Sequence, residues 1–81
     1  MTATERYEVK RKAKRIMKEH NKNVYIKDIV LLESGSSTRY GFEFIDYIMF
    51  RDSKTDSVYQ LSYGEYDEYL DTMWTVVEVE L

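Results

Sequence analysis

The chain contains no cysteine and no proline, and it has only three glycines among its 81 residues. Without cysteine there can be no disulfide, no thiolate metal ligand and no cysteine nucleophile. A secreted domain of this size often depends on disulfides, so we expect a cytoplasmic protein. With glycine confined to Gly35, Gly41 and Gly64, most breaks between elements must come from clusters of Ser, Asn and Asp.

Residues that usually carry catalysis are also scarce. His20 is the single histidine, and at a predicted helix end it is typical of a dipole-compatible terminal residue rather than a general base. The serines within residues 34–37 have no base placed beside them. Carboxylates such as Asp67 and Asp71 lack EF-hand spacing, and neither GxxxxGK[ST] nor GxGxxG occurs. We therefore expect a protein that is not an enzyme, with no metal site and no cofactor.

Long hydrophobic runs are missing as well. The segment Met1–His20 is dense in charge, unlike a signal peptide, and no stretch approaches the length of a membrane span. What is present is 43% hydrophobic and 15% aromatic residues, enough to form a core. A chain of this length has room for one core, so we predict a single α+β domain over residues 1–81 with no membrane attachment.

The first predicted element is a helix from Glu5 to His20. Its apolar residues recur at helical spacing at Val9, Ala13, Ile16 and Met17. Thr2 and Glu5 have the spacing of a capping box, with Thr4 as a competing cap, and Asn21 or Asn23 supplies a stop.

Two predicted hairpins follow. We predict a strand over Val24–Glu33, bulged near Lys27–Asp28, and then a flexible turn over Ser34–Thr38. A long strand follows over Arg39–Arg51, and after a polar turn another over Val58–Tyr63. These segments form a three-stranded antiparallel meander.

The last third of the chain is predicted to form a short second helix and a final strand. A helical stripe comprises Tyr66, Tyr69, Leu70, Met73 and Trp74, and Thr75–Leu81 alternates as a strand does. No loop separates these two elements, so whether residues 73–76 are helix or strand stays open. The order is αβββαβ, with the helices on one face of the sheet. The predicted core brings Val9, Ile16 and Met17 against Phe42, Phe44 and Ile48.

Charge is divided between the two parts of the chain. Residues 1–27 hold nine Lys or Arg and three Glu, a net charge of +6, whereas residues 28–81 hold three Lys or Arg and twelve acids, a net charge of −9. No basic residue follows Lys54. The overall charge of −3 therefore conceals a strong asymmetry.

The acidic segment is also rich in tyrosine, which suits a protein-binding surface. Asp67 and Asp71 form an i, i+4 pair about 6 Å apart, comparable with neighbouring phosphates. Our leading hypothesis is a nucleic-acid mimic that docks on a nucleic-acid-handling enzyme and inhibits it, as small phage anti-restriction and anti-CRISPR proteins do. A solvated helix face is the competing interpretation. The residues of this candidate surface are Tyr63, Tyr66, Asp67, Glu68, Tyr69 and Asp71.

The basic helix offers an alternative, in which its cations contact phosphates and Tyr25 or Tyr40 stacks on a base. These cations are Arg11, Lys14, Arg15, Lys18 and Lys22. The isoelectric point near 5.1 counts against a nucleic-acid binder. A third hypothesis is a structural or assembly subunit, in which the basic helix of one copy meets the acidic segment of another in a homo-oligomer.

Overall fold

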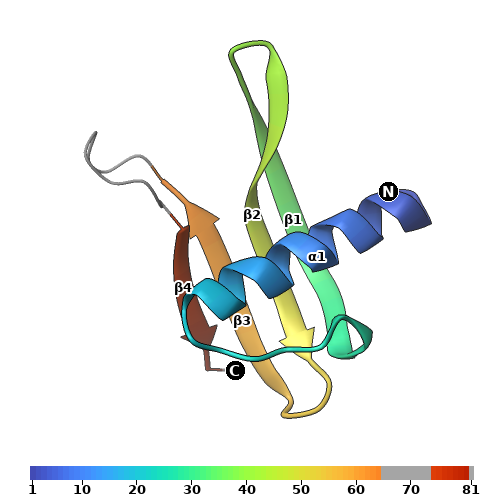
Figure 1. The fold of residues 1–81 in the computed structure, drawn as a ribbon, viewed down its shortest axis with the longest axis vertical. Coiled ribbons are helices and arrows are strands. Elements are labelled where there is room, and N and C mark those ends of the chain that lie inside the picture. Colours follow the sequence, from blue (N-terminus) through green and yellow to red (C-terminus); the bar gives the residue numbers. More distant parts are fainter. Residues whose placement is uncertain (65–73, 81) are drawn as a thin grey trace.

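The computed structural model describes residues 1–64 and 74–80. It shows an α+β fold, with one helix and a four-stranded antiparallel sheet (Figure 1). The elements are helix α1 (Ala3–Glu19), the 3-10 turn η1 (Ile26–Asp28), and strands β1 (Ile29–Arg39), β2 (Phe42–Asp52), β3 (Ser57–Tyr63) and β4 (Trp74–Val79). The strands lie in the sheet in the order in which they occur in the chain, so the predicted meander is confirmed.

Both ends of α1 are stabilised by the residues that the sequence indicated. The Thr2 hydroxyl accepts a hydrogen bond from the Glu5 amide at 3.1 Å, and the Glu5 carboxylate accepts one from the Thr2 amide at 3.3 Å, which completes a capping box. At the other end Asn21 adopts a left-handed φ of 60°. The Lys22 amide then donates to the Met17 carbonyl at 2.9 Å, as in a Schellman motif.

The core lies between α1 and one face of the sheet. Ile16 and Met17 of α1 pack on Ile48, Phe50 and Leu61, all essentially inaccessible to water. Ile48 is paired across the sheet with Leu61 and lies in the middle of this layer. The predicted core residues Val9, Ile16, Met17 and Ile48 are therefore confirmed.

The first predicted hairpin is placed wrongly. Ser34–Thr38, predicted to be a turn, belongs to β1, and the segment before Ile29 holds the turn η1 instead of a bulged strand. The reason is that β2 supplies backbone partners along the whole serine-rich segment, which outweighs its low strand propensity. The true turn is Tyr40–Gly41, with φ values of 54° and 81°, as in a two-residue type I′ hairpin loop.

Phe42 and Phe44, predicted to be core residues, are exposed by 69% and 43%. The reason is a β-bulge at Asp46. Gly35 pairs with Tyr47 and Ser36 pairs with Ile45, so that Asp46 is left without a partner. The extra residue shifts the alternation by one, and Ile45 packs against the core in place of its neighbour Phe44.

The predicted second helix is not confirmed. Its residues from Tyr66 to Met73 lie outside those that the structure describes, and Trp74, the last member of its stripe, is the first residue of β4. Residues 74–76 are strand, and the final strand begins one residue earlier than predicted. The predicted end of this strand, Leu81, also lies outside the described residues.

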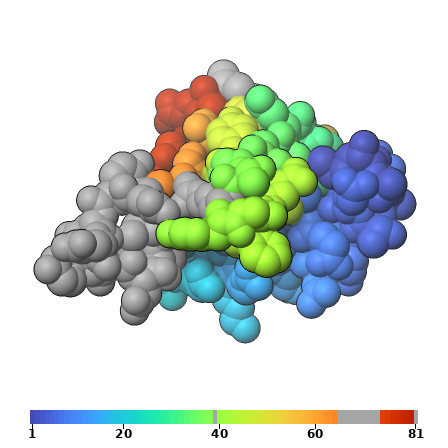
Figure 2. Space-filling view, turned by 90° about the horizontal axis from the view of Figure 1, so that it is seen from above, coloured from blue at the N-terminus to red at the C-terminus, as the bar shows by residue number. Residues whose placement is uncertain are grey.

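The hairpin of β1 and β2 extends past the rest of the molecule, with Tyr40 at its tip (Figure 1). Figure 2 looks onto this tip and shows it in front of the remainder of the molecule, with the N-terminal half of α1 to its right. No helix within the two described ranges is long and apolar enough to span a bilayer.

Candidate functional site

The predicted acidic, tyrosine-rich surface is only partly visible. Tyr63 lies in β3 opposite Trp74 of β4, and the two rings meet edge to face with their centroids 5.6 Å apart. The remaining residues lie outside the described residues, so the acidic surface stays a prediction; they are Tyr66, Asp67, Glu68, Tyr69 and Asp71.

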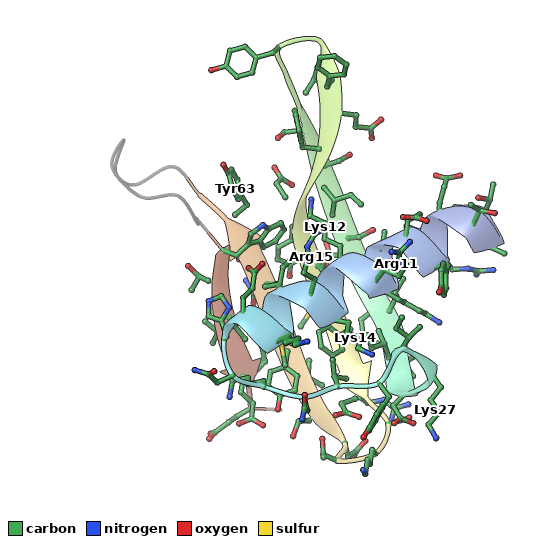
Figure 3. All side chains as sticks on the ribbon, in the orientation of Figure 1. Arg11, Lys12, Lys14, Arg15, Lys27 and Tyr63 are labelled. Carbon is green, nitrogen blue, oxygen red and sulfur yellow. The ribbon has the colours of Figure 1, made fainter. Side chains whose placement is uncertain are left out.

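The predicted basic surface is fully described. Its five residues, Arg11, Lys14, Arg15, Lys18 and Lys22, are all exposed on or just after α1. Arg11 lies 3.9 Å from the Glu8 carboxylate, a contact between two exposed side chains that contributes little to stability. Lys12 and Lys14 project from opposite flanks of the helix, because residues two apart are rotated by about 160° in projection. Figure 3 shows them on the two sides of α1.

Three lysines from different elements gather around Tyr25, which is 53% exposed. The ammonium nitrogens of Lys14, Lys27 and Lys54 lie 6.0, 5.9 and 5.3 Å from the centroid of its ring. They come from α1, from η1 and from the turn between β2 and β3. We call these four residues the tyrosine–lysine cluster. Lys27 and Lys54 could not be recognised from the sequence, because no local spacing links them to α1.

Backbone hydrogen bonds fix the parts of the chain that bear this cluster. The Asp28 amide donates to the Tyr25 carbonyl at 2.9 Å and closes η1. The Ser53 amide donates to the Asp28 carbonyl at 2.8 Å, which ties η1 to the turn between β2 and β3. Within that turn the buried Asp52 carboxylate accepts a hydrogen bond from the Lys54 amide at 3.0 Å. Tyr25 and Lys54 are therefore held on one connected backbone frame.

The cluster carries concentrated positive charge. None of its three lysines forms an ion pair with any residue in the described part of the chain. Asp56, in the turn that bears Lys54, forms an ion pair with Arg51 at 3.1 Å. Because the three ammonium groups lie 5.3–6.0 Å from one centroid, no two can be more than about 12 Å apart, and each has two like charges near it. The negative face of the Tyr25 ring offsets part of their repulsion.

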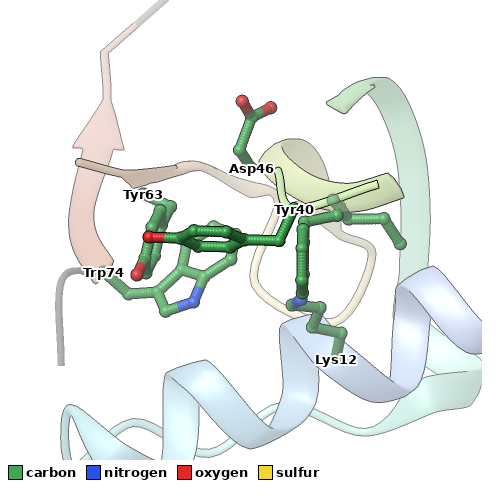
Figure 4. Close-up of a pocket in the computed structure, with 7 residues that line it drawn as sticks. Lys12, Tyr40, Asp46, Tyr63 and Trp74 are labelled. Carbon is green, nitrogen blue, oxygen red and sulfur yellow. The ribbon is translucent and has the colours of Figure 1, made fainter. Parts of the chain in front are cut away.

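A separate cavity of about 220 Å³ lies on the other flank of α1 (Figure 4). The Lys12 ammonium lies 5.4 Å from the centroid of the Trp74 ring. Burial, with a smaller contribution from the nearby Arg15 charge, lowers the pKa of Lys12 below its usual value of 10.5. The cavity is lined by Lys12, Tyr40, Phe44, Ile45, Asp46, Tyr63 and Trp74. Tyr40 and Tyr63 were predicted to belong to different surfaces, and no signal in the sequence links them.

His20 has a structural position. Its Nδ1 lies 2.9 Å from the Ile16 carbonyl oxygen, and its Nε2 lies 3.1 Å from the Trp74 carbonyl oxygen. The imidazole thereby connects the C-terminal end of α1 to the start of β4. Both ring nitrogens lie within hydrogen-bond distance of a backbone carbonyl oxygen, and the neutral ring donates its single N–H to one of the two.

Among the described residues, no three His, Asp or Glu side chains converge in a way that would hold a metal ion. No protein-family model, curated protein or solved structure gives a significant match to this chain. Its function must therefore be inferred from the geometry of its own surface.

Proposed function

We propose that this protein binds nucleic acid, and that it contacts the phosphate backbone through the tyrosine–lysine cluster and the exposed face of α1. The observation that carries this proposal is the convergence of three lysine ammonium groups on the half-exposed ring of Tyr25. Cations without anionic partners repel one another, and a polyanion relieves that repulsion while releasing its own counterions.

The net charge of −3 does not oppose this proposal, because binding follows the local field rather than the total. Residues 1–27 carry a net charge of +6, and they contribute α1, Tyr25 and two of the three lysines. The Lys22 ammonium lies 5.9 Å from the centroid of the Tyr59 ring, a second pairing of lysine with an aromatic residue. Lys18 and Lys22 are both exposed and add positive charge outside the cluster.

Two features favour nucleic acid over an anionic membrane. The apolar face of α1 is buried against the sheet, so the helix has no apolar stripe to insert between lipids. The cluster also surrounds an aromatic ring, and aromatic rings beside cations are typical of surfaces that bind single strands. The acidic mimic predicted from the sequence makes the opposite prediction, namely no affinity for DNA or RNA.

The proposal is tested by fluorescence anisotropy of labelled single-stranded DNA, RNA and duplex DNA at low and physiological salt. Each phosphate contact adds about −0.7 to the salt slope on single strands. Replacing three lysines by glutamine should therefore reduce the slope by roughly 2 units and weaken binding most at low salt. The variant is Lys14→Gln, Lys27→Gln and Lys54→Gln, and the matched control replaces the same three residues by arginine, which keeps the charge.

We expect the arginine control to bind as the natural protein does. If the glutamine variant binds with the same affinity and the same salt slope as the natural protein, the cluster makes no phosphate contact. Binding to anionic phospholipid vesicles but to none of the three nucleic acids would refute the proposal in favour of a membrane surface. The absence of nucleic-acid binding even at low salt would also refute it, and would favour the acidic mimic.

A further inference from the structure

We propose that the cavity beside Lys12 is a slot for one unstacked nucleobase, so that the protein prefers single-stranded nucleic acid. This inference rests on the proposed function, and it adds a second site on the opposite flank of α1. The slot combines aromatic side chains with one cation, a combination that is typical of sites for unstacked nucleotides (Figure 4).

The first observation concerns Tyr40. It occupies a left-handed turn position with a φ of 54°, where Asn, Asp or Gly is favoured, and its side chain is 96% exposed. A bulky residue in this region of φ and ψ is an outlier, and burial of its ring does not compensate for the strain. Tyr40 therefore does not serve the stability of the hairpin, and it lines the cavity from the hairpin tip.

The aromatic side of the cavity that Tyr63 and Trp74 form is preassembled. Tyr63 and Trp74 face each other across β3 and β4 with ring centroids 5.6 Å apart and an interplanar angle of 61°. In the view of Figure 4 the Tyr40 ring, at the tip of the hairpin, is drawn in front of this pair. The cavity of about 220 Å³ is smaller than the roughly 300–1,000 Å³ of sites for drug-sized ligands. It suits one flat ring system and not a larger ligand.

The polar groups of the cavity define the chemistry further. Lys12 has no anionic partner among the described residues, and burial lowers its pKa, so that the surroundings disfavour its ammonium form. A phosphate beside Lys12 would compensate the charge. Asp46 lines the cavity, but its carboxylate points away from Lys12 and Trp74 (Figure 4), so Lys12 is the charged group that a nucleotide in the slot would meet.

The slot and the tyrosine–lysine cluster fit one ligand. Lys12 faces the slot and Lys14 faces Tyr25, on opposite flanks of α1, and the exposed Arg11 and Arg15 project from the helix near them (Figure 3). A single strand that crosses the exposed face of α1 would reach both. A duplex could contact the cations, but its stacked and paired bases could not enter the slot.

Trp74 is the only tryptophan in the chain and lies in the wall of the slot, so its fluorescence reports directly on occupancy. The experiment titrates the protein with oligo(dC), oligo(dT) and a duplex of the same length, and follows both anisotropy and Trp74 emission. We expect quenching by oligo(dC) and by oligo(dT), and none by the duplex.

Tyr40→Asn is the decisive variant, because asparagine suits a left-handed turn position and keeps the hairpin folded. We expect it to weaken binding of oligo(dC) by roughly tenfold, within the range for loss of one base stack, while the melting temperature stays the same or rises. Thr55→Ala, in the exposed turn between β2 and β3, is the control and should leave Trp74 quenching unchanged.

Two negative results separate this inference from the proposed function. If anisotropy shows binding but Trp74 is not quenched, the slot is wrong and the proposed function still stands. The same holds if Tyr40→Asn binds oligo(dC) as tightly as the natural protein does. If no oligonucleotide binds in anisotropy, the proposed function is wrong, and cytidine monophosphate then tests the slot by itself. Failure of millimolar cytidine monophosphate to quench Trp74 would overturn the slot as well.

Discussion

Replacing His20 by alanine should lower the free energy of unfolding by about 1–3 kcal/mol. The magnitude follows from the two hydrogen-bond contacts of the imidazole, at 2.9 Å to the Ile16 carbonyl and 3.1 Å to the Trp74 carbonyl, both partly shielded from water. A neutral imidazole has one N–H donor and donates to one of these carbonyls at a time, and loss of the ring leaves a partly buried carbonyl group unsatisfied, which costs about 1–3 kcal/mol. The Trp74 contact matters most, because it joins α1 to a strand 54 residues away.

The assay is urea unfolding, followed by far-ultraviolet circular dichroism and by Trp74 fluorescence. With an m-value of about 1 kcal/mol/M, at the low end for small proteins, the midpoint should fall by roughly 1–3 M. Lys18→Ala provides the control, since Lys18 is exposed in the same last turn of α1 and should change stability by no more than about 0.5 kcal/mol. A His20→Ala variant as stable as this control would refute the view that the imidazole connects helix and strand.

Two further predictions concern the helix cap and the core. Hydrogen bonds from the Thr2 backbone and hydroxyl lower the pKa of Glu5 below 4.5, so the stabilising contribution of the cap is present above that pH and is lost as pH falls through the lowered pKa. An NMR titration of Thr2→Ala should show the Glu5 pKa rising only part of the way toward 4.5, because alanine keeps the backbone amide that is the larger cause of the shift, and an unchanged value would mean that the Thr2 side chain does not contribute to the shift. Phe50 is fully buried, and Phe50→Ala should cost about 3–5 kcal/mol in thermal unfolding. If the free energy of unfolding of Phe50→Ala falls by less than about 1 kcal/mol, the core collapses around the missing ring.

The helix could be predicted from the sequence because its signals are local. The Thr2 and Glu5 pair, the apolar stripe and the Asn21 stop all act within a few residues of one another, and the structure contains each of them. Strand existence was also predictable for β2 and β3, where aromatic and β-branched residues alternate.

The errors arose where a distant partner decides the outcome. Ser34–Thr38 has the composition of a turn, yet its backbone pairs with β2 as part of the sheet. The hairpin therefore closes only at Tyr40–Gly41. The exposure of Phe42 and Phe44 depends on one unpaired residue, Asp46, which shifts the alternation. A bulge of this kind depends on register and is not visible in the pattern of a single strand.

The candidate site was predictable only as a set of helix cations. The sequence indicated Lys14 and Tyr25, but Lys54 joins them solely because the turn after β2 is tied to η1 through Ser53 and Asp28. The cavity likewise combines α1, the hairpin tip and the β3 and β4 pair, which only the folded chain brings together.

The order of strands in the sheet also has a consequence for how quickly the protein folds. Each strand pairs with the next one along the chain, so no pairing requires closure of a long loop before it contributes stability. The β1 and β2 hairpin closes through two residues and can form on the microsecond scale. The meander should therefore assemble by successive addition of neighbouring strands, and the speed of folding should depend mainly on docking of α1, whose contacts with the sheet span the longer separations in the chain.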